Sequence, residues 1–188
     1  MNREEVLRYL RTSSETQDEK IIALVETAYD KIETVSTPKT LYRIFDCTVN
    51  ADGVTLGGVE FKSARLAENL KGCKRVVLFG ATLGTETDRL IRAAASTDVA
   101  KAMAYQAAAA AKIEEVCNSL EESICKESGV TLRQRYSPGY YDLKIEEQKK
   151  VFALLELTKR IGLTLTDTCE MLPTKSVTAF IGIEKSEE

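Results

Sequence analysis

Histidine is missing from this chain of 188 residues. Because histidine is the commonest general base and the commonest metal ligand, its absence excludes Ser-His and Cys-His nucleophile pairs. Most hydrolase mechanisms are excluded with them. Any chemistry must therefore rest on carboxylates, tyrosines and arginines, or be carried by a bound molecule that brings its own reactive atom.

The cysteines form no recognisable zinc or redox motif. The sequence has five of them, at Cys47, Cys73, Cys117, Cys125 and Cys169. Their number is odd, no CxxC pair occurs, and no histidine could complete a zinc site. We expect reduced, mostly buried thiols and no metal site.

Long apolar runs and a strong charge of either sign are also missing. The longest apolar stretches are far shorter than the ~20 residues that a membrane-spanning helix needs. The first residues, MNREEVLRYL, are charged and amphipathic rather than typical of a secretory leader. The 26 lysines and arginines face 29 aspartates and glutamates and are spread along the chain, which is not the pattern of a nucleic-acid-binding surface. We therefore expect a cytoplasmic protein whose partners are neither membranes nor nucleic acids.

The composition, with 44% hydrophobic and 29% charged residues, is typical of a globular chain with a substantial core. No internal repeat, low-complexity tract or linker-like stretch divides the sequence. We expect one domain over residues 1–188, with an N-terminal helical region over 1–36 and fraying over 183–188.

The first third of the chain predicts two helices and a hairpin. Residues 2–11 and 17–34 are both typical of helices, and the second has apolar residues at the three-and-four spacing of a single buried stripe. Two extended runs follow at 40–49 and 54–61, and Asp52-Gly53 supplies the turn between them. This pattern predicts an antiparallel pair of strands.

The remainder predicts helices alternating irregularly with strands. Val76–Phe79 is apolar on successive residues, as expected for a central strand that is buried on both faces. The other predicted elements are helices at 64–70, from Glu86, at 98–126 and at 145–160, and strands at 130–136, 163–167 and 177–184. The fold class that follows is α+β, with a mainly antiparallel twisted sheet flanked by helices.

A first candidate site is the strand-turn-helix segment VVLFGATLGTETDR, whose turn could receive an anion on its backbone N–H groups. Gly80 and Gly84 do not make a GxGxxG motif and no GK[ST] is present, so an ordinary structural turn is the better interpretation. A nucleotide-binding α/β enzyme would also need alternating parallel βα units, which the early hairpin does not support.

A second candidate is RYSPGYYD, residues 135–142. Pro138 fixes φ and Gly139 permits positive φ, so a tight turn can bring the Arg135 guanidinium and the Tyr140 ring toward one space. Arginine can grip a carboxylate through two parallel hydrogen bonds, and a tyrosine can hold a nearby cation. These residues suit an amino-acid-like ligand. The alternative is a plain turn with exposed tyrosines.

A third candidate is Glu114, which lies close to the edge of the apolar stripe of the helix predicted at 98–126. A carboxylate in this position is often simply solvated. It could also accept hydrogen bonds from the ammonium group or the ribose hydroxyls of a ligand.

Two motifs in order along the chain resemble the activation domain of cobalamin-dependent methionine synthase. The first is RYSPGY, from Arg135 to Tyr140, and the second is LTDTCEMLPTKSV, from Leu165 to Val177. Together they cover about 45 residues, with Thr166, Met171, Pro173, Ser176 and Val177 at family positions. The resemblance implies an activation-domain-like fold in a free-standing form.

The resemblance also implies a site for S-adenosylmethionine. The arginine and tyrosine of the first motif, Arg135 and Tyr140, would hold the ligand, and Glu114 matches a glutamate on the preceding helix. Backbone contacts are implied around Ser137 and Gly139. The second motif would supply a rim toward the partner and its cobalamin, at Met171, Pro173 and Ser176.

This sequence departs from the family in three places. YDLKIEEQ stands where the family has cysteines and a proline, and a C-terminal extension that carries another ligand tyrosine has no counterpart. We therefore expect a different affinity for the ligand. An N-terminal aspartate that the family uses has no clear match in this sequence, and Asp46 and Asp52 are the two residues that could take its place.

The implied function is accessory. The domain would bind S-adenosylmethionine and present its methyl group for reductive methylation of cob(II)alamin. The cobalamin would be held by a separate methionine synthase core or a related corrinoid protein. A flavodoxin-like or other low-potential donor would supply the electron, and no independent turnover is expected. The alternative is a module that binds or senses S-adenosylmethionine without a corrinoid partner.

Overall fold

The computed structural model describes residues 3–13, 16 and 18–184. Its elements, in order along the chain, are α1 (Arg3–Tyr9), α2 (Glu19–Val35), β1 (Lys39–Val49), β2 (Gly53–Leu56), β3 (Val59–Lys62), α3 (Ala64–Asn69), β4 (Arg75–Thr82), α4 (Thr85–Ala95), α5 (Val99–Ser128), β5 (Thr131–Leu132), the 3-10 turn η1 (Ile145–Glu147), α6 (Gln148–Leu155), α7 (Leu157–Ile161), β6 (Thr164–Leu165), β7 (Met171–Leu172) and β8 (Ser176–Glu184). Residues 2 and 17, with which two of the predicted helices begin, lie outside the described residues.

The centre of the molecule is a six-stranded sheet in the order β3-β2-β1-β4-β8-β5. Every pair of neighbouring strands in it is antiparallel. The long strand β1 pairs with β4 over 39–46 and then with β2 over 47–49, so it links the hairpin to the centre of the sheet. The α+β class with a mainly antiparallel sheet is confirmed.

Strand β4 lies between β1 and β8, and its apolar run is buried completely. Successive side chains of a strand point to opposite faces, so Val77 and Phe79 enter one apolar core while Val76 and Leu78 enter the other. The prediction of a central strand buried on both faces is confirmed.

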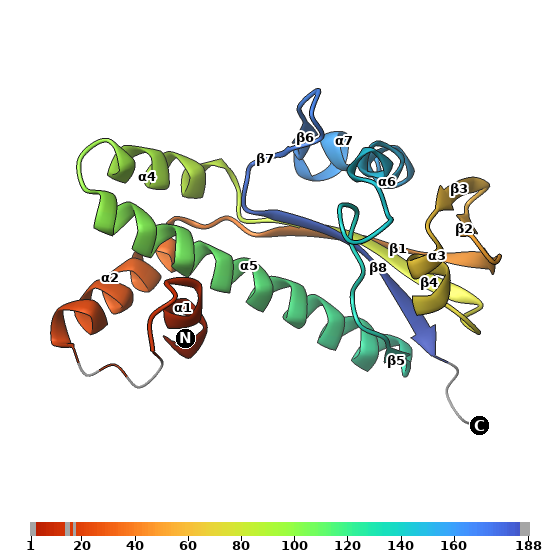
Figure 1. Cartoon of the computed structure of the whole chain (residues 1–188), viewed down its shortest axis with the longest axis horizontal. Coiled ribbons are helices and arrows are strands. Elements are labelled where there is room, and N and C mark those ends of the chain that lie inside the picture. The colour runs from red at the N-terminus through yellow and green to blue at the C-terminus, as the bar shows by residue number, and fades with distance from the viewer. Residues whose placement is uncertain (1–2, 14–15, 17, 185–188) are drawn as a thin grey trace.

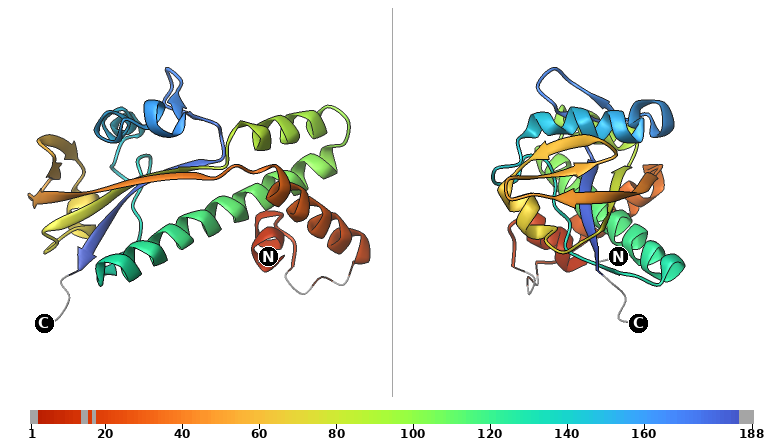
Figure 2. Two further views of the ribbon diagram at one scale, coloured as in Figure 1. Left: turned by 180° about the vertical axis from the view of Figure 1, so that it is seen from behind. Right: turned by 90° about the vertical axis from the view of Figure 1, so that its right-hand side faces the viewer.

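Helices cover both faces of the sheet (Figure 1). The core on one face includes side chains from α1, α2, α4 and α5, and the core on the other includes side chains from α3, α6 and α7. The views from behind and from the end show the same layers, with α5 running along one face of the sheet (Figure 2). None of the described helices is both long and apolar enough to cross a membrane.

Helix α5 is the longest element, and its sequence explains its bounds and its close packing. Asp98 accepts a hydrogen bond from the amide of Lys101 at the N-terminus, and Gly129 ends the helix with a left-handed φ of 61°. The alanines at 107, 108, 109 and 111 are buried and allow close approach of neighbouring elements.

Two predicted elements are divided in the structure. The run at 54–61 is not one strand, because Gly57 and Gly58 have φ of 54° and 80° and reverse the chain between β2 and β3. The helix predicted at 145–160 is also divided. Glu156 has φ of 53°, which a helix does not accommodate, and it separates α6 from α7.

Two predicted strands are shorter than expected. The segment 130–136 pairs with β8 only through β5 and an isolated bridge between Tyr136 and Phe180. The segment 163–167 contributes only β6, which pairs with β7 outside the main sheet. The expectation of fraying from residue 183 is wrong for Ile183 and Glu184, because both belong to β8; residues 185–188 lie outside the described part of the chain.

We predict that Gly84→Ala destabilises the fold more than Gly72→Ala. Alanine is strained at both glycines because their φ values are positive, 86° and 83°, and Gly84, with ψ of 169°, lies in a region that is essentially restricted to glycine. A Cβ at Gly84 would also overlap Oγ1 of Thr37, whereas nothing lies within 4 Å of a Cβ at Gly72. The extra loss at Gly84 should reach about 1 kcal/mol or more. Urea unfolding of both variants measures it, and equal losses would contradict the role assigned to this contact.

Candidate functional site

A cavity of about 680 Å³ lies at one edge of the main sheet and brings together most of the residues singled out from the sequence. The family resemblance implied roles for eight residues in the site and its rim. Six of them line the cavity: Glu114, Arg135, Ser137, Tyr140, Met171 and Ser176. They come from α5, from the segment between β5 and η1, and from the first residues of β7 and β8.

The cavity exists because the chain after β5 separates from β8. The last two residues of β8 pair with β5, and Phe180 pairs with Tyr136. Within the described residues no strand pairs with this edge of β8 over 176–179. Val177 and Thr178, which point to opposite faces of the sheet, both line the cavity, so it follows the strand edge.

Arg135 is held by three side chains of α5. Its Nη2 donates to Oε2 of Glu114 at 2.9 Å and to Oδ1 of Asn118 at 2.9 Å. Its Nη1 lies 3.0 Å from Oε1 of Glu121. The three partners are spaced by four and three residues, which places them on one face of the helix. The guanidinium side chain is 23% exposed, so it lies at the boundary between α5 and the cavity.

The carboxylates that contact Arg135 carry more negative charge than its single guanidinium neutralises. Two carboxylates, Glu114 and Glu121, contact one guanidinium, and burial raises the pKa of Glu121. The ion pair with Glu121 is short but poorly aligned. Within the described residues, Nη1 of Arg135 and Oε1 of Glu121 are buried without a hydrogen-bond partner. The arrangement favours a cationic ligand group near Glu114 and leaves the guanidinium able to form a better-aligned bond.

The turn that follows Arg135 presents an aromatic ring at the cavity. Pro138 is buried, and Gly139 has φ of 93° and donates to the carbonyl oxygen of Leu143 at 2.8 Å. Tyr140 lines the cavity and is 63% exposed. Its ring is therefore accessible both to a ligand and to solvent.

The end of the same turn is fixed to α3. Asp142 accepts hydrogen bonds from Oγ of Ser63 at 2.6 Å and from the amide of Ala64 at 2.7 Å. The N-cap residue of α3 is Ser63, and Asp142 acts as a second cap from outside the helix, since it accepts from amides that Ser63 leaves free. The Ser63 hydroxyl, followed by the amides of Arg65 and Ala64, lowers the pKa of Asp142. The ring of Tyr141 also stacks on that of Tyr136, with centroids 6.4 Å apart.

Two of the expected residues do not line the cavity. Gly139 shapes the turn, and Pro173 is buried and accepts a hydrogen bond on its carbonyl oxygen from Oγ of Ser176 at 2.6 Å. Neither Asp46 nor Asp52 lines it. Asp46 pairs with Arg75 in the sheet, and the Asp52 carbonyl oxygen accepts from the amide of Ser63.

Sequence reasoning did not identify Asn118, Glu121 and Asp142. The first two lie one and two helical turns beyond Glu114, so the spacing on α5 could have indicated them. Asp142 carries no local signal, because it caps a helix 78 positions earlier in the chain.

The structure does not support a nucleotide-binding enzyme built on β4. Strand β4 is antiparallel to both of its neighbours, which contradicts the βα units of a nucleotide-binding enzyme. All five cysteines are free, and Cys73, Cys117 and Cys169 are buried. In the described part of the chain, no group of three or more histidine, cysteine, aspartate or glutamate side chains could hold a metal ion.

Two comparisons with known proteins give matches. The family described as "Vitamin B12 dependent methionine synthase, activation domain" matches residues 74–187. Among solved structures, the chain is similar to the crystal structure of the MetH reactivation domain bound to AdoHcy. The TM-score is 0.66 at 18% sequence identity, over 96% of this chain and 70% of that one. No curated protein matches the sequence.

We predict that Asp142→Ala lowers the free energy of unfolding by about 1 kcal/mol at neutral pH, the usual loss for a helix cap. The folded pKa of Asp142 is lowered, so its contribution is complete above the unfolded pKa of about 4. It is lost as the pH falls through the folded pKa. Urea unfolding between about pH 3 and pH 7 should therefore show the gap between wild type and variant shrinking only below about pH 4.

Glu26→Ala is the control, because it removes an acidic side chain from the exposed face of α2. It should not reproduce this pH profile. A gap for Asp142→Ala that is absent at neutral pH, or that grows on acidification, would contradict the capping role.

Proposed function

Since this chain belongs to the activation-domain family of vitamin B12-dependent methionine synthase, we propose that its edge cavity binds S-adenosylmethionine and presents the methyl group outward. The acceptor is cobalamin on a separate methionine synthase or related corrinoid protein. The role is accessory, and this chain by itself does not turn over.

The observation that carries this proposal is the pairing of Arg135 with Glu114 at the wall of the cavity, with Tyr140 at its mouth. An amino acid has a carboxylate and an ammonium group on one carbon. Arginine and glutamate side chains that lie 2.9 Å apart can meet both groups at once. Binding exchanges the internal ion pair for two ion pairs with the ligand.

The remaining cavity suits the other parts of the ligand. Its volume of about 680 Å³ lies within the range of small-molecule sites. The unpaired edge of β8 at 176–179 offers main-chain donors and acceptors to a ribose or an adenine. The excess negative charge at Glu114 and Glu121 favours a sulfonium cation over a neutral thioether.

S-adenosylmethionine supplies an electrophilic methyl group, and the reduced cobalt of the partner supplies the nucleophile. The residues of this chain then need only to bind and orient. Arg135 and Glu114 hold the amino-acid end, and the turn from Ser137 to Tyr140 holds the ligand along its length. No general base is required, which agrees with a sequence that contains no histidine.

The partner must reach the mouth of the cavity. Three large apolar side chains that line the cavity are also exposed to solvent. They are close together in the chain: Tyr140, Tyr141 and Ile145. They form a surface that a cobalamin domain can cover. Because the ligand must also exchange, we expect a transient interface of modest area. A flavodoxin-like or other low-potential donor reduces the cobalt.

We predict that Arg135→Ala weakens S-adenosylmethionine binding by at least about 2 kcal/mol, about thirty-fold in Kd, because the ligand carboxylate loses its charged donor. Arg135→Lys should also bind poorly, since a point charge cannot replace the planar fork. Titration calorimetry measures both. Arg92→Ala, on α4 and outside the cavity, is the control. Equal affinity in wild type and Arg135→Ala would refute the site.

The accessory role has its own test. Methylcobalamin formation from cob(II)alamin is followed on a methionine synthase that lacks its own activation domain, with a low-potential electron donor and S-adenosylmethionine. Addition of this chain should stimulate formation, and the Arg135→Ala variant should stimulate much less. If the chain binds S-adenosylmethionine but stimulates no corrinoid partner, the alternative of a metabolite-binding or sensing module is the correct one.

A further inference from the structure

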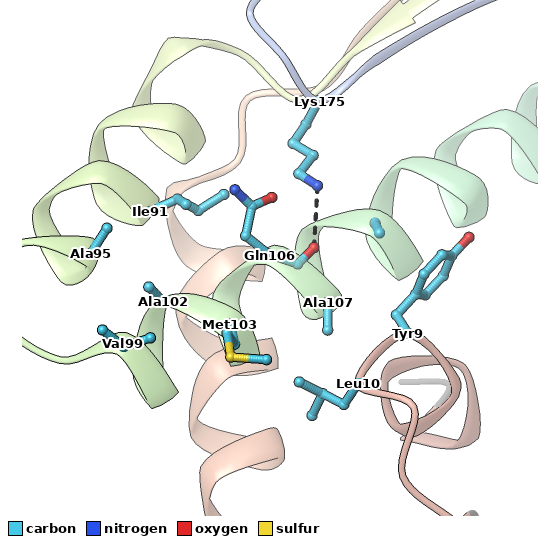
Figure 3. Close-up of a pocket in the computed structure, with 11 residues that line it drawn as sticks. Tyr9, Leu10, Ile91, Ala95, Val99, Ala102, Met103, Gln106, Ala107 and Lys175 are labelled. Atoms are coloured by element: carbon cyan, nitrogen blue, oxygen red, sulfur yellow. Dashed lines mark hydrogen bonds between the residues drawn. The ribbon is translucent and has the colours of Figure 1, made fainter.

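A second pocket lies on the helical side of the molecule and shares no lining residue with the edge cavity. Its volume is about 410 Å³. The side chains come from the end of α1, from α4, from the first half of α5, and from Lys175 just before β8 (Figure 3).

The walls of this second pocket are mostly apolar, and the lining residues that carry polar side-chain groups are Tyr9, Gln106 and Lys175. Leu10, Ile91 and Ala102 line its interior, while Val99 and Met103 are 69% and 57% exposed at its rim. Exposed apolar side chains beside an apolar cavity are unusual on a protein surface, where such groups more often occur singly. Apolar side chains therefore line the pocket both in its interior and at its rim.

One cation enters this apolar space. The Nζ of Lys175 points into the pocket and donates to the main-chain carbonyl oxygen of Gln106 at 3.3 Å (Figure 3). An ammonium carries three N–H groups, and among the described residues this is the one hydrogen bond that Nζ makes. The amine thus keeps donors for a ligand.

Among the described residues, no carboxylate forms an ion pair with Lys175. Asp88 acts on it through its charge, but the two oxygens of Asp88 accept from the amide and the hydroxyl of Thr174, at 2.7 and 2.8 Å. Burial lowers the pKa of Lys175. An anion beside the amine would offset this desolvation, because it favours the charged form.

We propose that the second pocket binds a small molecule with an apolar body and one terminal carboxylate, such as a medium-chain fatty acid. The carboxylate pairs with Lys175 and the chain lies along α4 and α5 between Ile91 and Met103. The volume falls in the range of small-molecule sites, which combine apolar walls with a few polar groups that fix orientation. A single cation in an apolar pocket selects a monoanion over a neutral molecule or an amine of the same shape.

The test uses sodium octanoate as the probe and titration calorimetry as the measurement. Octanoate should bind the full chain with one-to-one stoichiometry, and 1-octanol and octylamine should bind at least about ten-fold more weakly, because they lack the anion that pairs with the amine. Absence of octanoate binding, or equal binding of the three compounds, overturns the proposal.

Three variants locate the binding. Lys175→Met removes the ammonium group but keeps a side chain of similar length. This variant should bind octanoate about ten-fold more weakly than wild type, while its affinity for octanol stays unchanged. Ala110→Phe fills the pocket from the partly exposed face of α5 and should abolish binding of both. Lys31→Met, on the exposed face of α2, is the matched control and should bind octanoate like wild type.

Circular dichroism and thermal melting show that each variant is folded before it is titrated. Arg135→Ala separates this site from the edge cavity, since it should leave octanoate affinity unchanged. Loss of octanoate binding in Arg135→Ala, or retention of full affinity in folded Lys175→Met, would place the probe elsewhere and overturn the assignment.

Discussion

Strands β4 and β8 lie between two apolar layers, and this burial on both faces dictates where polar ligands can approach the sheet. Phe79 packs on the side of α5, and Leu78 and Phe180 on the side of α6. Since each face is covered by helices, the polar main-chain groups of the central strands are shielded there. Beyond the bridge at Phe180, the edge of β8 is uncovered, and the edge cavity lies along it.

The same constraint accounts for the position of Arg135. The segment between β5 and the turn crosses this edge, from the layer of α5 to that of α6 (Figure 1). Because Arg135 lies one residue before the bridge at Tyr136, its side chain points to the side of α5 and meets Glu114 and Glu121. Because two carboxylates share the guanidinium, the ion pair with Glu114 can be exchanged for one with a ligand while Glu121 stays paired with Arg135.

The elements that the sequence predicted correctly are those with a strong local pattern. The apolar run predicted the central strand β4, and the pattern at 98–126 predicted the long helix α5, whose ends are fixed locally by Asp98 and Gly129. The division at Glu156 was not predictable, because nothing in the local pattern indicates a positive φ there. At the site, the motif from Arg135 to Tyr140 indicated one wall of the cavity, whereas the contacts of Asp142 with α3 and the second pocket around Lys175 depend on segments that meet only in the folded chain.

The contacts of Asp142 with Ser63 and Ala64 bear on the entropy of the ligand binding that we propose for the edge cavity. The loop that carries Tyr140 is joined to β8 at its start through Tyr136 and to α3 at its end through Asp142. A free loop of this kind would lose backbone freedom of about 1–2 kcal/mol per residue when a ligand ordered it. Here that loss accompanies folding, so the loop is preorganised. More of the interaction energy between loop and ligand is then expressed as affinity.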